Sequence, residues 1–328
     1  MTTRSRMGLL WCLAATSILL SFTAPASAQY PNKPIKLVVP FAAGGPTDAL
    51  GRALAAAMRT HLGQPVIVEN HGGAGGNIGA QLVAQAPADG YTLLLATSGP
   101  LVVNVSLFKK LTFDPMKSFD PIIMIGTLPN VIVAHPSFPA KDVAELVAYS
   151  KAHKGELSFS HAGIGGSSHL AGEMFNSMAG TDLIQIPYRG ASLALNDVIG
   201  GQVQLSVLDV LVAAPQVKAG KIRALGVTTK ERASVMPDVP TLDEQGLKGF
   251  DSSVMFGVVA PRGTPSDILA RLNAVLAASL DEPALRAFLA AQGISRASST
   301  EAAYLSKYMG EEIPKWRKII ASIGIELQ

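Results

Sequence analysis

The hydrophobic positions of this chain occur in short runs, and several runs are followed by glycine-rich residues and then by a helical pattern. The first run is Ile35–Val39, and residues 40–45 separate it from a segment with apolar residues at helical spacing, namely Leu50, Leu54, Met58 and Leu62. A short apolar run indicates a buried strand, and this spacing indicates a helix that buries one face. The pattern therefore predicts a strand, a glycine loop and a helix in succession.

The same unit recurs along the chain. Apolar runs at 66–69, 91–96 and 157–160 lead into stretches rich in small or polar residues at 72–77, 97–100 and 163–168. Strands that alternate with helices are typical of α/β proteins with largely parallel sheets. Ligands of such sheets bind at the carboxyl ends of the strands, where these loops lie. We therefore expect an α/β fold with a binding site formed by the loops.

Three further apolar runs predict two lobes. Pro121–Ile125 and Val131–Ala134 lie near the middle of the chain, and Val254–Ala260 follows much later. If these runs form crossing strands, residues 131–253 form an inserted second lobe. The first lobe then consists of residues 29–130 and 254–328, and the crossing strands form the hinge.

The first glycine loop has the composition of an anion site. Gly44 and Gly45 allow a sharp turn and a close approach to a ligand, and Pro46 suits the first position of a helix. Asp48 falls near the third helical position, where a carboxylate suits the helix dipole. The N–H groups of a first helical turn bind carboxylates or phosphates without a charged side chain. The alternative is a tight connection that binds nothing.

Residues 1–28 have the features of a secretory signal peptide. Arg4 and Arg6 precede an apolar stretch from Leu9 to Phe22, and residues 26–28 read Ala-Ser-Ala, which predicts a mature start at Gln29. The apolar stretch is short for a transmembrane anchor, the alternative interpretation. Its Cys12 is the chain's only cysteine, so the predicted mature protein contains no disulfide and no cysteine-based metal site. We expect a periplasmic protein.

The charge of the chain argues against nucleic-acid binding. The formal charge is +3, and removal of Arg4 and Arg6 with the signal leaves +3 − 2 = +1. Nucleic-acid binders usually carry clustered Lys and Arg. The six histidines show neither H-x-H nor H-E-x-x-H spacing, so no metal site is expected.

The sequence argues against two classes of enzyme. Ser167 and His169 lie close together in the sequence, but the chain has no G-x-S-x-G motif and no carboxylate placed to complete a triad. Gly73, Gly75 and Gly79 have the spacing G-x-G-x-x-x-G, one residue longer than the dinucleotide fingerprint, and no acid follows the next strand. We therefore expect neither catalytic activity nor a cofactor.

Several motifs together resemble the Bug-type substrate-binding proteins of tripartite tricarboxylate transporters. They include Tyr30-Pro31-x-Lys33-Pro34-Ile35, Pro40-Phe41-x-x-Gly44-Gly45-x-x-Asp48, Gly73-Ala74-Gly75-Gly76-Asn77-Ile78-Gly79, Pro87-x-Asp89-Gly90-Tyr91-Thr92-Leu93, Tyr188-Arg189-Gly190, the segment 195–203 and the segment 218–225. The resemblance covers nearly the whole predicted mature chain. It implies a two-lobed periplasmic binding protein of type II that closes on a small organic acid like a Venus flytrap. It also implies delivery to the membrane components of a transporter by a monomeric receptor.

The resemblance also implies the ligand-binding residues. In the family, backbone N–H groups of the first glycine loop and ordered waters hold a carboxylate of the ligand. The positions that correspond in the first lobe are Phe41, Ala43, Gly44, Gly45, Thr47 and Asp48, with Ser98 and Asn104 at the entrance. The positions that correspond in the inserted lobe are Gly165, Gly166, Ser167, Ser168, His169, Tyr188, Arg189, Gly190, Ala191 and Asp209.

The sequence leaves the roles of several of these residues open. Ser167 and Ser168 could cap a helix as well as bind a ligand. Arg189 could pair with a second carboxylate or face solvent at the end of a strand. Asp209, in an apolar stretch, could bind an amine or hydroxyl of the ligand or cap the next helix. The sequence names no particular organic acid, and a sensor with the same pocket is the alternative to a transport receptor.

Overall fold

The computed structural model describes residues 30–323, so the predicted signal segment 1–28, with Cys12, lies outside the described residues. Residues 33–323 belong to one compact unit, to which the following account applies. Within the described range, no helix has both the length and the apolar character that a membrane span requires.

The unit is built on a ten-stranded mixed sheet. One group of parallel strands consists of β2 (Val66–Asn70), β1 (Ile35–Val39) and β3 (Thr92–Thr97). A second parallel group consists of β7 (Leu205–Asp209), β5 (Ser158–His161) and β6 (Ile184–Pro187). The strands of both groups precede helices, which confirms the predicted α/β class.

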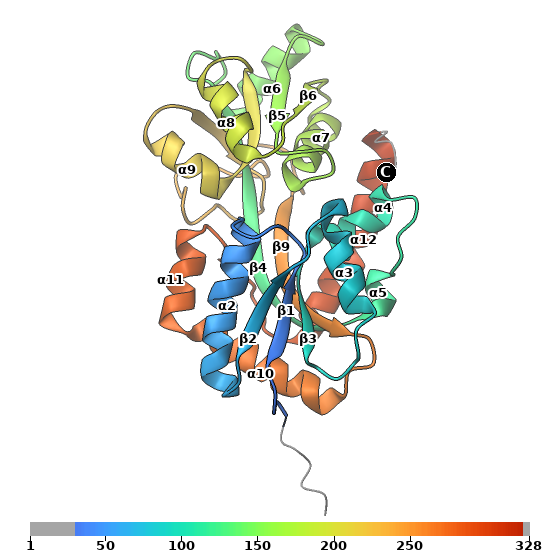
Figure 1. The fold of residues 1–328 in the computed structure, drawn as a ribbon. Helices are drawn as coiled ribbons and strands as arrows, with labels where there is room; N and C mark the ends of the chain where they lie inside the picture. Colours follow the sequence, from blue (N-terminus) through green and yellow to red (C-terminus); the bar gives the residue numbers. More distant parts are fainter. Residues whose placement is uncertain (1–29, 324–328) are drawn as a thin grey trace, which may run out of the picture. The chain divides into compact units, whose positions relative to one another are not determined.

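Two long antiparallel strands join the parallel groups, as Figure 1 shows. β4 (Phe119–Ala134) pairs with β9 (Ser253–Pro261) through Pro129. It pairs with β7 from Asn130 and with β8 (Arg223–Val227) from Val131. The short strand β10 (Ser295–Arg296) also pairs with β4. The apolar runs at 121–125 and 131–134 therefore belong to one continuous strand, which changes partners at residues 129–130.

Helices connect and cover these strands. The helix α2 (Pro46–Leu62) follows β1 and buries the four predicted residues Leu50, Leu54, Met58 and Leu62. The other helices are α3 (Asn77–Ala84), α4 (Asn104–Leu107), α5 (Pro115–Ser118), α6 (Val143–Ala152), α7 (Ser167–Ala179), α8 (Ala191–Ile199), α9 (Val210–Lys218), α10 (Ser266–Asp281), α11 (Pro283–Ala291) and α12 (Ala302–Ile323), with a 3-10 turn η1 (Ala74–Gly76) and a π-helical turn η2 (Gly99–Val103).

The chain crosses between the two strand groups at a buried cluster of hydrogen bonds. The Thr228 hydroxyl donates to the carbonyl oxygen of Ser252 at 2.6 Å and lies 3.0 Å from the carbonyl oxygen of Asn130. The hydroxyl oxygen of Thr228 also accepts a hydrogen bond from the N–H of Asn130 at 3.0 Å. All three residues are almost fully buried. One side chain therefore ties the three crossing segments together.

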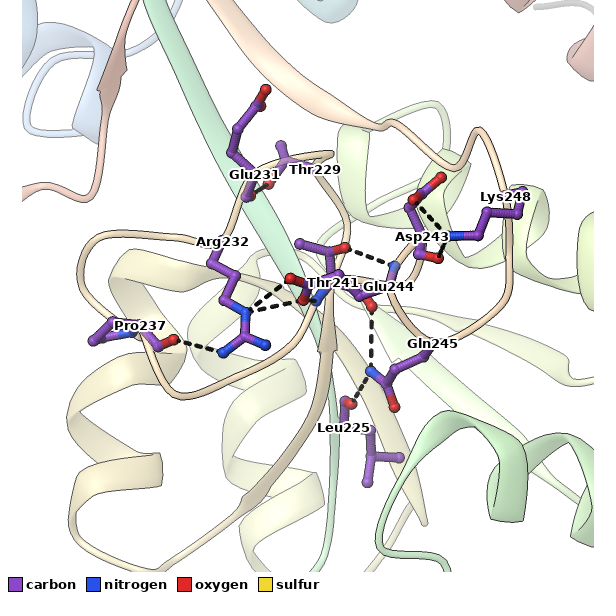
Figure 2. Close-up of polar contacts among 10 residues, drawn as sticks. All are labelled: Leu225, Thr229, Glu231, Arg232, Pro237, Thr241, Asp243, Glu244, Gln245 and Lys248. Atoms are coloured by element: carbon purple, nitrogen blue, oxygen red, sulfur yellow. Dashed lines mark hydrogen bonds and ion pairs between the residues drawn. The ribbon is translucent and has the colours of Figure 1, made fainter.

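Residues 228–252, between β8 and β9, contain no regular helix or strand but are held by their own polar contacts (Figure 2). Thr241 and Glu244 form a reciprocal turn, in which each backbone N–H donates to the other's side chain at 2.7 and 3.0 Å. Arg232 donates to both carboxylate oxygens of Glu244, and Gln245 donates to the carbonyl oxygen of Leu225. These contacts shape the segment that leads back to β9.

Candidate functional site

A cleft of about 380 Å³ lies where the loops of both strand groups meet the crossing strands. Small-molecule sites typically have this size and a mainly apolar lining with a few polar groups. The predicted residues that line the cleft are Phe41, Thr47, Ser98, Asn104, Gly165, Gly166, Ser167, Ser168 and Asp209. The sequence-based resemblance thus selected loops that the fold brings together from segments more than 100 residues apart.

The first glycine loop turns tightly before α2. Gly44 has φ +84°, in the left-handed region that favours glycine, and Gly45 is extended at the N-cap of α2. The N–H of Gly44 donates to Asp48 Oδ2 at 2.9 Å, and Arg52 Nε donates to the same oxygen at 3.0 Å. These hydrogen bonds, that from Arg52 foremost, lower the pKa of Asp48 to about 2. Asp48 therefore stays ionised and secures the turn from inside the protein.

The glycine loop that precedes α7, called the second loop from here on, has the same backbone geometry as the first. Gly165 has φ +76°, and Gly166 is extended at the N-cap of α7. The N–H of Gly165 donates to Nδ1 of His169 at 3.1 Å, again four residues along the chain. His169 therefore holds this loop in the way that Asp48 holds the first one.

The environment of His169 differs from that of Asp48. Its ring stacks on that of His161, with centroids 4.5 Å apart, and Nε2 lies 4.0 Å from Glu173 Oε1. Burial, and secondarily the neighbouring His161, lower the pKa of His169 to about 4. Because Nδ1 accepts from Gly165, the single ring proton of the neutral imidazole is on Nε2. The second loop is thus secured by a neutral group.

The helix starts supply the hydrogen-bond donors of the cleft. The first N–H groups of an α-helix have no partner within the helix, and the helix dipole makes this end positive. The cleft is lined by Pro46 and Thr47 at the start of α2 and by Ser167 and Ser168 at the start of α7. The Ser168 hydroxyl accepts from the N–H of Ala162 at 3.1 Å. Two helix N-termini therefore face one cavity.

Ser98 and Asn104 both line the cleft and also hold its walls. Ser98 Oγ accepts from the N–H of Met255 at 2.6 Å and donates to the carbonyl oxygen of Ser253 at 3.3 Å. Asn104 Nδ2 donates to the carbonyl oxygen of Gly75 at 3.0 Å and to Asn77 Oδ1 at 2.6 Å. Ser98 thus links β3 to β9, and Asn104 fixes the turn before α3.

The other predicted residues lie outside the lining of the cleft. They are Ala43, Gly44, Gly45, Asp48, His169, Tyr188, Arg189, Gly190 and Ala191. Tyr188 Oη donates to Asp197 Oδ2, and Arg189 is exposed between β6 and α8. Asp48 and His169 instead accept hydrogen bonds from the backbone of the two glycine loops. Direct contact of any of these residues with a ligand stays a prediction.

Asp209 is placed in the cleft at the end of β7. It occupies the N-cap position of α9, but its side chain makes no capping hydrogen bond. The interpretation of Asp209 as a helix cap was therefore wrong, because the carboxylate lines the cavity instead of bonding the first turn. Burial raises its pKa to about 6.

Several lining residues were not predicted. Leu128, Val254, Phe256 and Trp316 supply apolar surface, and Gly75, Ser252 and Ser253 supply backbone or hydroxyl groups. They come from β4, the start of β9, α12 and a turn, with no shared motif in the sequence. Over the described residues, no group of three or more His, Cys, Asp or Glu side chains is arranged to hold a metal ion.

Comparison with known proteins agrees with this geometry. Residues 50–325 match the model of the family described as tripartite tricarboxylate transporter family receptor. The chain belongs to this family. It is 36% identical over 307 residues to protein BugT of Bordetella pertussis, which covers 93% of this chain and 94% of BugT. The family is one of solute-binding receptors, and the expected resemblance to Bug-type proteins is confirmed.

Solved structures of receptors from this group share the fold. Periplasmic binding protein BugD has a TM-score of 0.77 and 39% identity, with 91% of this chain and 100% of BugD covered. R. palustris Rpa4515, solved with adipate, has a TM-score of 0.79 and 34% identity, with 90% of this chain and 99% of Rpa4515 covered. The two-lobed periplasmic-binding-protein architecture is therefore confirmed.

Proposed function

We propose that this receptor binds a small carboxylate between the N-termini of α2 and α7 and delivers it to the membrane components of a tripartite tricarboxylate-type transporter. The observation that carries the proposal is the pair of helix N-termini that face one cavity. Each helix end carries about half a positive charge and several free N–H donors. The adipate in the related Rpa4515 structure supports the same ligand class.

Closure of two lobes around the ligand is part of this proposal. The change of partners along β4 at residues 129–130, and the start of β9 at Ser253, support a division into residues 29–130 with 254–328 and residues 131–253. Thr228, bonded to Asn130 and Ser252, lies at the proposed hinge. Contacts that a ligand makes only in the closed form would shift the population towards closure.

The remaining proposals concern the setting of the receptor. We infer export through the N-terminal signal segment to the periplasm, action as a monomer and no catalytic activity. The periplasmic BugD relative supports the location. The uncharged, mainly small or apolar character of most of the cleft supports binding without catalysis.

The test is a thermal-shift titration of the protein from Gln29 onward with mono-, di- and tricarboxylates. A ligand at 100 times its dissociation constant adds about 2.7 kcal/mol to the free energy of unfolding, a readily measured rise in Tm. The folded state is checked first by circular dichroism, and carried-over ligand is removed by refolding. A folded, ligand-free protein with no shift for any carboxylate would contradict the proposal.

A matched pair of variants tests the helix N-terminus directly. Ser167→Pro removes one N–H donor at the first position of α7, where proline is well tolerated, and extended Gly166 is compatible with a following proline. Ser167→Ala removes only the hydroxyl. We expect the proline variant to lose about tenfold in affinity, equivalent to about 1.4 kcal/mol, and the alanine variant to lose less. Equal losses in the two variants would contradict a role for this N–H.

A further inference from the structure

The charges that line the cleft are unbalanced. Among the described lining residues, Asp209 is the one with a charged side chain, and no Lys, Arg or His is among them. The other polar side chains of the lining belong to serine, threonine and asparagine residues, which are neutral. The only formal charge in the cleft is therefore negative.

Asp209 also lacks a partner within the protein. In the part of the chain that the structure describes, its carboxylate takes part in no hydrogen bond, ion pair or helix cap. The same cleft is lined by Leu128, Val254 and Phe256, which offer no donor side chain. Asp209 is partly buried at the end of β7, and this burial raises its pKa. A carboxylate that loses part of its hydration without gaining a partner is costly. A ligand that supplies a donor would remove this cost.

The charge balance of the cleft indicates which kind of donor the ligand would supply to Asp209. The N-termini of α2 and α7 together contribute about one positive charge, which matches one carboxylate of a ligand. Asp209 then remains unbalanced. A second carboxylate on the ligand would add to the excess negative charge, and Arg189, which the sequence offered as its partner, lies outside the cleft. A positive group on the ligand balances Asp209.

We propose that the ligand of this receptor is a zwitterion of the amino-acid type, with its carboxylate at the helix N-termini and its ammonium group against Asp209. This inference rests on the proposed function, because it assumes that a carboxylate binds at the two helix ends. It makes Asp209 the specificity-determining residue of the cleft. It also separates this receptor from its relative solved with the dicarboxylate adipate.

The experiment compares probes that share a carboxylate and differ in whether they also carry an amino group, a second carboxylate or neither. One set is 6-aminohexanoate, hexanoate and adipate, and a second is 4-aminobutyrate, butyrate and succinate. A third set pairs L-leucine, L-phenylalanine and L-glutamate with their acids that lack the amino group. Each is titrated by calorimetry against the protein from Gln29 onward at pH 7.5, where Asp209 is ionised. We expect the amino compound to bind at least tenfold more tightly than the other members of its set.

Two variants of equal charge change complete the test. Asp209→Asn keeps the size of the side chain and removes its charge, and we expect it to abolish the preference for the amino compound. Asp182→Asn makes the same change at an exposed position between α7 and β6, outside the cleft, and should leave the preference unchanged. The comparison of probes on the unmodified protein stands even if Asp209→Asn fails to fold.

The outcomes separate the two proposals. Tighter binding of a dicarboxylate or of the plain acid would overturn the zwitterion and leave the carboxylate receptor intact. A preference for amino compounds that survives in Asp209→Asn would overturn the role of Asp209. An absence of binding by every probe would contradict the proposed function itself.

Discussion

The two glycine loops use one backbone design with two different side chains. In each loop a left-handed glycine precedes an extended N-cap glycine, and the first glycine's N–H donates to the side chain four residues later. That acceptor is the Asp48 carboxylate in the first turn of α2 and the His169 imidazole in the first turn of α7. Asp48 is paired with the exposed Arg52, whereas His169 is buried against His161.

The difference shows how the environment selects the acceptor. Asp48 has a cation beside it, so a charged acceptor is stable there. His169 faces Glu173 and an aromatic ring, where a second carboxylate would be repelled and poorly solvated. A neutral imidazole can accept the same hydrogen bond without carrying a charge. Local geometry thus requires an acceptor, and the surroundings decide its charge.

The largest expected effect comes from removal of the buried acceptor. His169→Ala leaves the N–H of Gly165 without its partner and opens a cavity next to His161, so we expect a loss of about 3–5 kcal/mol in the free energy of unfolding. Asp48→Ala should cost less, because Gly44 is exposed and water can replace the carboxylate. Urea unfolding of both variants provides the comparison. A greater loss in Asp48→Ala would invalidate the distinction between the two loops.

The pH dependence of stability should also differ between the loops. The pKa of His169 falls from 6.5 to about 4 on folding, so the unfolded chain binds more protons between these values. The associated stability is complete above pH 6.5 and is lost as the pH falls towards 4, with a total of about 3 kcal/mol. For Asp48, whose pKa falls from 3.8 to about 2, the loss occurs only below pH 3.8.

The control for this prediction is His169→Gln, which replaces the Nδ1 acceptor with an amide oxygen and does not titrate. Unfolding of the wild type and the variant is measured from pH 7.5 to 4. The difference in pH dependence between the two proteins should fall in the window from 6.5 to 4. Parallel curves over this window would contradict a neutral His169 in the folded protein.

Substitutions of the glycines should have a smaller effect. Alanine at Gly44 or Gly165 must adopt positive φ, at a cost of about 1–2 kcal/mol, whereas Gly45 is extended and has room for a methyl group. A methyl group on Gly165 would also approach Leu107 Cδ1 at 3.1 Å, so this variant should be the less stable of the two. Thermal unfolding of the three variants gives the order. Equal destabilisation by Gly45→Ala would show that strain is not the cause.

The smallest expected effect is that of Arg52→Gln. Its side chain is 59% exposed, so water and salt screen the pair with Asp48. We expect a slight decrease in Tm that disappears when the wild type and the variant are compared in 1 M NaCl. A decrease that persists at high salt would indicate that Arg52 acts through packing instead of charge.

The sequence predicted the local structure around the first loop well. Asp48 lies at the third position of α2, and the four apolar residues of that helix are buried as expected. These features depend on neighbours within one helical turn or on a repeat along one element. Of the two adjacent glycines, Gly44 has positive φ and Gly45 is extended, and a close approach of either to a ligand stays a prediction.

The sequence predicted the lining of the cleft less completely. Leu128 and Trp316 are far apart in the chain and belong to β4 and α12, yet both line the cavity. No motif marks such residues, since any buried strand or helix contains similar side chains. Asp209 was identified as unusual in an apolar stretch, but its orientation into the cleft depends on how β7 pairs with β4.

The strands and helices around the glycine loops, the turns themselves and the two helix N-termini could be predicted from the sequence alone, because they follow from periodicity and from contacts between residues close in the chain. The tertiary structure decided which side chains reach the cleft, why His169 is neutral, and why Arg189 is outside while Asp209 is inside. Burial and electrostatic surroundings arise from segments distant in sequence. They are therefore defined only when those segments pack together.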